Sequence, residues 1–97
     1  MYQEWGTVNV TASGEVTSAK TATRVKSIHI ISTSGGASVV SLKNNGTSGT
    51  VFITETGTVS TGKTFYYGED GILFPSGCWA AFDGNTSSVA VVCRTQL

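Results

Sequence analysis

The sequence has few charged residues and no long apolar run. Only 12% of its 97 residues are charged, and six Lys and Arg balance six Asp and Glu, so the formal net charge is zero. Nucleic-acid binders need clustered basic side chains against the phosphates, and here the cations are scattered. No stretch approaches the length of about 20 apolar residues that spans a bilayer. We therefore expect neither a nucleic acid nor a membrane as a partner.

Helical patterns and targeting signals are also scarce. The chain has three Leu and four Glu, and no long segment repeats apolar residues at helical spacing. Its first residues, MYQEW, lack the basic start and the apolar run of a secretory signal. We expect synthesis in a cytoplasm without a signal peptide, where cysteines stay reduced.

Residues that favour strands are abundant, because Val, Ile and Thr together number 31. The segment 12–23 is expected to be a connection that contains a short edge strand at Val16. Elsewhere, alternating apolar residues between Gly, Asn and Ser turns predict strands at 7–11, 24–32, 38–43, 50–55, 58–61, 64–67, 72–74, 78–83 and 88–94. About eight short strands at a spacing of roughly 8–12 residues are typical of a sandwich or barrel.

We therefore predict one all-β domain over residues 1–97, an antiparallel β-sandwich that is jelly-roll-like, with an N-terminal arm at 1–6. Consecutive Ile30 and Ile31 interrupt the alternation, which makes the buried face of 24–32 the least defined. The predicted core consists of Val8, Val10, Ile28, Ile30, Val40, Leu42, Val51, Ile53, Phe74, Val89 and Val91.

Motifs for catalysis, cofactors or metals are weak. The segment 57–64 (GTVSTGKT) fits the P-loop pattern, but FYYG follows it, which predicts a strand and a turn where a P-loop needs a helix. His29 is the only histidine and has no nucleophile or orienting acid at a recognisable spacing. Neither cysteine stands in a metal-binding pattern. We expect no enzyme activity, no cofactor and no metal.

Cys78 and Cys93 form a candidate cross-strand thiol pair. If residues 84–87 are a four-residue hairpin loop, Cys78 falls directly opposite Cys93, within reach of a disulfide. The alternative, which we favour in a reducing compartment, is two small buried thiols.

Aromatic residues suggest where a partner could dock. Neighbouring strand residues point to opposite faces, so part of the set must lie on an outer face or at a chain end. One interpretation is a core with ordinary surface rings. The other is a docking surface for a protein or a stacking platform for a sugar, since Tyr and Trp are large, stiff and polar-tipped. The candidate assembly surface consists of Tyr2, Trp5, Tyr66, Tyr67 and Trp79.

A family resemblance covers residues 24–94. It is carried by DGILFPSGCW at 70–79, by the valine-rich segment 89–92, and by the upstream order of 25–31, 39–43 and 49–53. These segments resemble small virion proteins of tailed bacteriophages, notably those of marine and cyanobacterial phages. In that family a G-[IV]-x-F-x-x-G-x-[YW] stretch precedes a final valine-rich strand. Cys78 stands where an Ile or Val is expected, which does not disturb the alternation.

The resemblance implies a structural protein of the virion. Our leading hypothesis is an outer-capsid decoration or cement protein, made in the host cytoplasm, which bridges capsomers of the major capsid protein. It would act as a homo-oligomer, and a trimer would suit local threefold positions. One alternative is a tail, fibre or adaptor component with a protein- or glycan-binding surface. A second alternative is a non-viral β binding module.

Overall fold

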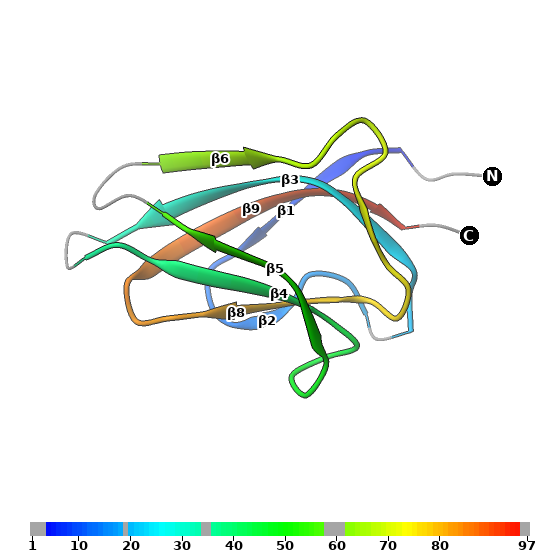
Figure 1. Cartoon of the computed structure of the whole chain (residues 1–97), viewed down its shortest axis with the longest axis horizontal. Coiled ribbons are helices and arrows are strands. Elements are labelled where there is room, and N and C mark those ends of the chain that lie inside the picture. The colour runs from blue at the N-terminus through cyan, green and yellow to red at the C-terminus, as the bar shows by residue number, and fades with distance from the viewer. Residues whose placement is uncertain (1–3, 19, 34–35, 58–61, 96–97) are drawn as a thin grey trace.

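The chain forms a long antiparallel ribbon that is folded back on itself and then rolled into two sheets (Figure 1). In this computed structural model, the described residues are 4–18, 20–33, 36–57 and 62–95. The ribbon turns between β4 (Val39–Asn44) and β5 (Thr50–Thr56). Asn45 and Gly46 have φ values of 74° and 83° in this turn, as an Asn-Gly pair permits.

Successive pairs of strands lie along the ribbon from this turn outward. After the β4·β5 pair, β3 (Thr23–Ser32) pairs with both β6 (Gly62–Tyr66) and β7 (Ile72–Phe74). Next, β2 (Gly14–Glu15) pairs with β8 (Cys78–Phe82). Finally, β1 (Gly6–Val10) pairs with β9 (Thr86–Thr95). All of these pairs are antiparallel.

The ribbon closes into two sheets through two further pairs, β3·β9 and β4·β8. The first sheet has the order β1-β9-β3-β6, with β7 also paired to β3, and the second has the order β2-β8-β4-β5. Figure 1 shows the two sheets as facing layers. The fold is therefore an antiparallel β-sandwich with jelly-roll topology, as the strand pattern predicts.

The core lies between the sheets and consists of alternate residues of the longer strands. Ten of the eleven predicted core residues point into the core. Nine of these are buried, and the tenth, Val8, is partly buried. The exception is Val51, which is 46% exposed. Five further core residues were not predicted from the sequence, namely Val16, Val25, Cys78, Ala80 and Cys93.

A bulge explains why Val51 is outside the core. Leu42 pairs with Ile53 and Lys43 pairs with Val51, so Phe52 is an extra residue in β5. Each bulge exchanges the inward and outward positions beyond it. Val51 therefore shares the outer face with Lys43. A similar irregularity at Lys26 lets both Val25 and Ile28 point inward although they are three residues apart.

The predicted hairpin between 78–83 and 88–94 is wrong. β8 and β9 belong to different sheets, and the turn between them crosses from one layer to the other. Asp83 holds this turn, because its Oδ1 accepts bonds from Asn85 N at 3.1 Å and from Thr86 Oγ1 at 2.8 Å. The predicted strand 58–61 lies outside the described residues.

Candidate functional site

The predicted docking residues do not form one surface. Tyr66 pairs with Ser27 on the outer face of the first sheet and is 60% exposed. Trp79 lies between buried Cys78 and Ala80, so its side chain is on the outer face of the second sheet. These two rings therefore point away from each other, and Tyr2 lies outside the described residues.

Tyr67 closes the open side of the sandwich between β5 and the chain that comes after β6. Its hydroxyl donates a hydrogen bond of 2.8 Å to Oε2 of Glu55, and both residues are half-buried. Burial, together with this bond to a carboxylate, raises the pKa of the Tyr67 phenol well above its ordinary value. Tyr67 thus connects the two sheets.

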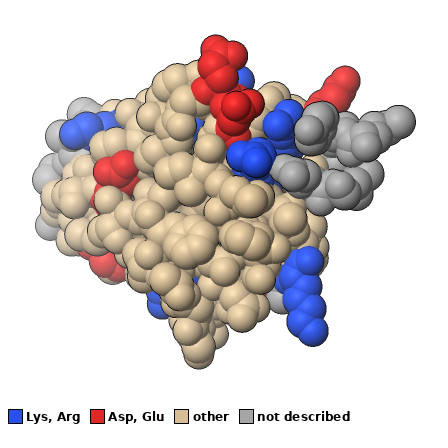
Figure 2. All heavy atoms as spheres, turned by 45° about the vertical axis from the view of Figure 1, so that its right-hand side comes forward, with Lys and Arg blue, Asp and Glu red and all other residues tan. Residues whose placement is uncertain are grey.

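Trp5 carries two cations on its ring. Lys26 Nζ lies 5.0 Å from a ring centroid of the indole, and Arg94 Cζ lies 4.6 Å from one. Such cation–π contacts fix the Trp5 side chain against β3 and β9. The face in Figure 2 is largely uncharged, with a few basic and acidic side chains close together near its top and one basic side chain alone at the lower right. Trp5 is therefore held against its own sheet.

Both cysteines are free thiols that point into the core from opposite sheets. Their burial agrees with the interpretation as two buried thiols, and the β8·β9 register that would have placed them directly opposite each other is wrong. Burial, with a smaller contribution from Cys93, raises the pKa of Cys78 to about 12, and burial also raises the pKa of Cys93. Such thiols are poor nucleophiles.

Residues of the P-loop pattern lie in an ordinary strand. Gly62 to Thr64 belong to β6, and Lys63 Nζ lies 5.2 Å from the Phe65 ring centroid. His29 covers this strand, because its Nδ1 is 2.7 Å from Thr64 Oγ1 and a side chain at Gly62 would collide with its ring. The part of the motif from Gly62 to Thr64 thus has a strand conformation and continues into the strand predicted from Thr64 onward.

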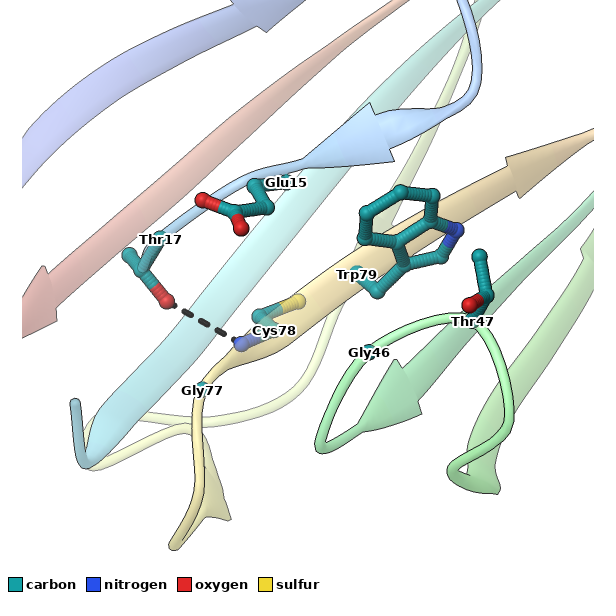
Figure 3. A pocket seen from close by; sticks show the side chains of 7 residues that line it. All are labelled: Glu15, Thr17, Gly46, Thr47, Gly77, Cys78 and Trp79. Atoms are coloured by element: carbon teal, nitrogen blue, oxygen red, sulfur yellow. Dashed lines mark hydrogen bonds between the residues drawn. The ribbon is translucent and has the colours of Figure 1, made fainter. Parts of the chain in front are cut away.

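Trp79 borders a pocket of about 140 Å³ at one end of the second sheet (Figure 3). Its walls come from the end of β2, the start of β8 and the loop between β4 and β5. The lining residues are Glu15, Thr17, Gly46, Thr47, Gly77, Cys78 and Trp79. Figure 3 shows the Glu15 carboxylate on one side of the indole and Thr47 on the other.

Hydrogen bonds hold the walls of the Trp79 pocket in place. Lys43 Nζ donates to the Thr47 carbonyl at 3.0 Å and fixes the β4–β5 loop. Asn44 Oδ1 accepts from Ser76 N at 2.8 Å, which fixes the turn before β8. Asn45 N donates to the Gly77 carbonyl at 3.2 Å and joins the two segments. The pocket is therefore formed before any ligand enters.

The hydroxyl of Thr17 is already engaged. Its Oγ1 accepts from Cys78 N at 3.0 Å and lies 2.7 Å from Thr23 Oγ1. Because Thr23 Oγ1 donates its proton to the Thr21 carbonyl at 2.8 Å, Thr17 must donate to Thr23. Toward the pocket Thr17 can thus only accept a bond. Within the described part of the chain, no bond occupies the side chains of Glu15 and Thr47.

Trp79 was predicted from the sequence as a docking residue, whereas Glu15 and Thr47 were not. Glu15 meets Trp79 only through the two-residue strand β2, which no alternation pattern could place. Thr47 comes directly after the Asn-Gly turn and is placed by the position of the loop. The Asn-Gly turn could have indicated the position of Thr47 in a loop, whereas no sequence pattern could have indicated the position of Glu15.

The fold and pocket define a small jelly-roll domain with an aromatic pocket on its outer surface. Comparisons with protein-family models, curated proteins and solved structures found no match to the chain. Over the described ranges, no group of three or more His, Cys, Asp or Glu could hold a metal ion. No helix in those ranges is long and apolar enough to cross a membrane.

Proposed function

We propose that the chain is a structural, non-catalytic protein of a tailed-phage virion, and that it decorates the outer capsid. Jelly rolls serve both as viral capsid domains and as lectin domains, so the topology is compatible with this role. The resemblance of residues 24–94 to phage virion proteins supports the same class. The observation that carries the proposal is the exposed apolar part of edge strand β5.

β5 is the last strand of the second sheet and has no strand partner on its outer side among the residues described. Val51 and Phe52 are 46% and 41% exposed, and no charged residue occurs between Thr50 and Ile53. Edge strands in monomers are usually protected by charges, and β6, the edge strand of the first sheet on the same side of the sandwich, does carry Lys63. The unprotected half of β5 therefore suits contact with another protein subunit.

In this proposal, the apolar half of β5 packs against the major capsid protein, and a homo-oligomer such as a trimer bridges neighbouring capsomers. A stable interface buries about 800 Å² on each partner. That area is about a sixth of the chain's accessible surface of 4991 Å².

Copy number in purified particles tests the proposal. Quantitative mass spectrometry against the major capsid protein should find hundreds of copies per particle. About a dozen copies would place the protein in the tail, because an axial structure of low symmetry holds few copies of each subunit. That result would favour the alternative function, a tail, fibre or adaptor component. Absence from particles would overturn both assignments.

A matched pair of variants tests the docking strand. Particles that lack the protein should recover their heat resistance when the purified wild-type protein is added. The Val51→Glu variant should fail to restore it. Ile31→Glu, which changes a side chain of similar exposure (43%) on the other sheet, should restore it. Equal restoration by both variants would exclude β5 as the docking strand.

A further inference from the structure

We propose that the Trp79 pocket binds one neutral sugar residue, with the indole as the stacking platform and Glu15 as the hydrogen-bond acceptor. This inference goes beyond capsid decoration and does not depend on it. It would hold equally for a protein of the tail or for a domain outside any virion.

The indole of Trp79 is accessible to a flat ligand. Trp79 points outward, and the neighbouring residues on that face of the sheet, Ala81 and Ser41, have small side chains. The face of an aromatic ring carries a partial negative charge, and the C–H groups on one side of a pyranose ring are weakly positive. Trp79 is half-buried, and the part of its indole that borders the pocket therefore offers a sugar a flat surface.

The polar groups around the ring are mostly hydrogen-bond acceptors. The Glu15 carboxylate accepts only, whereas the Thr47 hydroxyl can donate and accept. Thr17 can accept one more bond, because its proton is used by Thr23. Acceptors thus prevail on the β2 side of the indole. A ligand with several hydroxyl donors along one edge satisfies this arrangement.

The charges beside the indole favour a neutral ligand over a cation. In the register of the sheet, Glu15 pairs with Trp79, and Trp79 pairs with Lys43 on its other side. A carboxylate and an ammonium group therefore flank the same indole. A cationic side chain would be attracted by Glu15 and repelled by Lys43, whereas a neutral sugar can hydrogen-bond without net repulsion.

Size and rigidity agree with one sugar ring. The pocket volume of about 140 Å³ corresponds to about five water molecules at liquid density. That is below the range of roughly 300–1,000 Å³ for drug-sized ligands. Because hydrogen bonds already fix the walls, little ordering is needed on binding. At ordinary efficiency, a ligand of about a dozen heavy atoms binds in the millimolar range.

The experiment monitors the indole N–H signal of Trp79 by NMR while ligands are added to the full chain. Trp5 gives the other indole signal and serves as an internal reference. The probes are glucose, galactose, mannose and N-acetylglucosamine, each also as its β-methyl glycoside. Tetramethylammonium chloride tests the cation alternative. We expect saturable shifts of the Trp79 signal with at least one sugar and none with the ammonium salt.

Variants separate the pocket from other aromatic surfaces. Glu15→Gln keeps the indole and the shape of the side chain, and it should weaken sugar binding about tenfold, the effect of one charged hydrogen bond. Trp79→Ala, which lacks the indole signal and is followed through the backbone amide signals of the lining residues Gly46 and Thr47, should abolish binding. Tyr66→Ala, on the opposite sheet, should leave it unchanged. The proposal is overturned if no sugar shifts the Trp79 signal. Stronger binding of tetramethylammonium, or equal loss with Tyr66→Ala, would also overturn it.

Discussion

Replacing Tyr67 with Phe removes the one hydroxyl that joins the open side of the sandwich to a carboxylate of β5 within the described chain. The ring stays, so the packing of Tyr67 against the core cluster is preserved. Only the 2.8 Å bond to Glu55 is lost. The variant therefore measures the strength of this connection between the two sheets.

The size of the effect depends on the chemistry and the exposure of the pair. A hydrogen bond to a charged group contributes about 1.5–3 kcal/mol to stability. Because Tyr67 and Glu55 are only half-buried, solvent screening reduces this value, and we expect about 1 kcal/mol at pH 7. Domains of this kind are stable by about 5–15 kcal/mol, so the variant still folds.

The contribution of Tyr67 should also depend on pH. In the unfolded chain the phenol has a pKa near 10, and in the folded protein burial and Glu55 raise that pKa. Above pH 10 the unfolded state therefore binds fewer protons than the folded state, and stability falls as pH rises. The advantage of Tyr67 over Phe is fully present below pH 10. It should vanish near pH 11, since one pH unit corresponds to about 1.4 kcal/mol.

Urea denaturation of wild type and Tyr67→Phe between pH 7 and 11 measures this difference. The buried thiols also weaken the fold at high pH, but they do so equally in both proteins and cancel in the comparison. Tyr66→Phe, whose ring is 60% exposed, should match wild type within about 0.5 kcal/mol. A Tyr67→Phe difference that stays constant up to pH 11 would refute the reasoning.

Three further predictions concern the core, one turn and the thiols. Ile30→Val should cost about 0.5–1.5 kcal/mol in urea denaturation, because Ile30 is fully buried, whereas Ile31→Val on the outer face should cost less than about 0.5 kcal/mol. Gly71→Ala should lower the free energy of unfolding by about 1–3 kcal/mol or more, because φ is +69° and the added Cβ would collide with a carbonyl of β3. The prediction would be contradicted if Gly68→Ala, where the space is open, lowered stability more. Cys78 should resist a thiol reagent at pH 8 until urea unfolds the chain, because a pKa of about 12 leaves only about one Cys78 side chain in ten thousand as thiolate. If Cys78 reacted in the folded protein as fast as in the unfolded chain, its burial would be contradicted.

The fold class and most of the core could be predicted from the sequence because both depend on local patterns. Period-two alternation identified the strands, and the Asn45-Gly46 pair identified the turn at the centre of the ribbon. The inward face of β3 was predicted from Ile28 and Ile30 even though Ile31 interrupts the pattern. Each of these features is determined by residues that are close together in the sequence.

The errors arose at one bulge and one turn, where a single residue decides the course of a strand. The bulge at Phe52 places Val51 on the outer face, and nothing in the sequence of β5 indicates that one residue is extra. The turn after Asp83 was interpreted as a hairpin, although it crosses between sheets. β9 pairs with β3 because Val89 and Val91 then match Ile30 and Ile28 over a ten-residue strand. The five residues of β8 offer no comparable pairing surface.

The pocket depends on the ribbon as a whole, which is why only one half of it was predicted. In each strand pair from the β4–β5 turn outward, the two partner residues lie at similar sequence distances before and after that turn. Glu15 therefore meets Trp79 for the same reason that Leu42 meets Ile53, although the first two are much farther apart in sequence. A shift of one residue between β2 and β8 would turn Glu15 to the face opposite the indole. The face itself is set by the β4·β8 pair, in which Leu42 and Ala80 pair and both point inward, so that Trp79, next to Ala80, points outward.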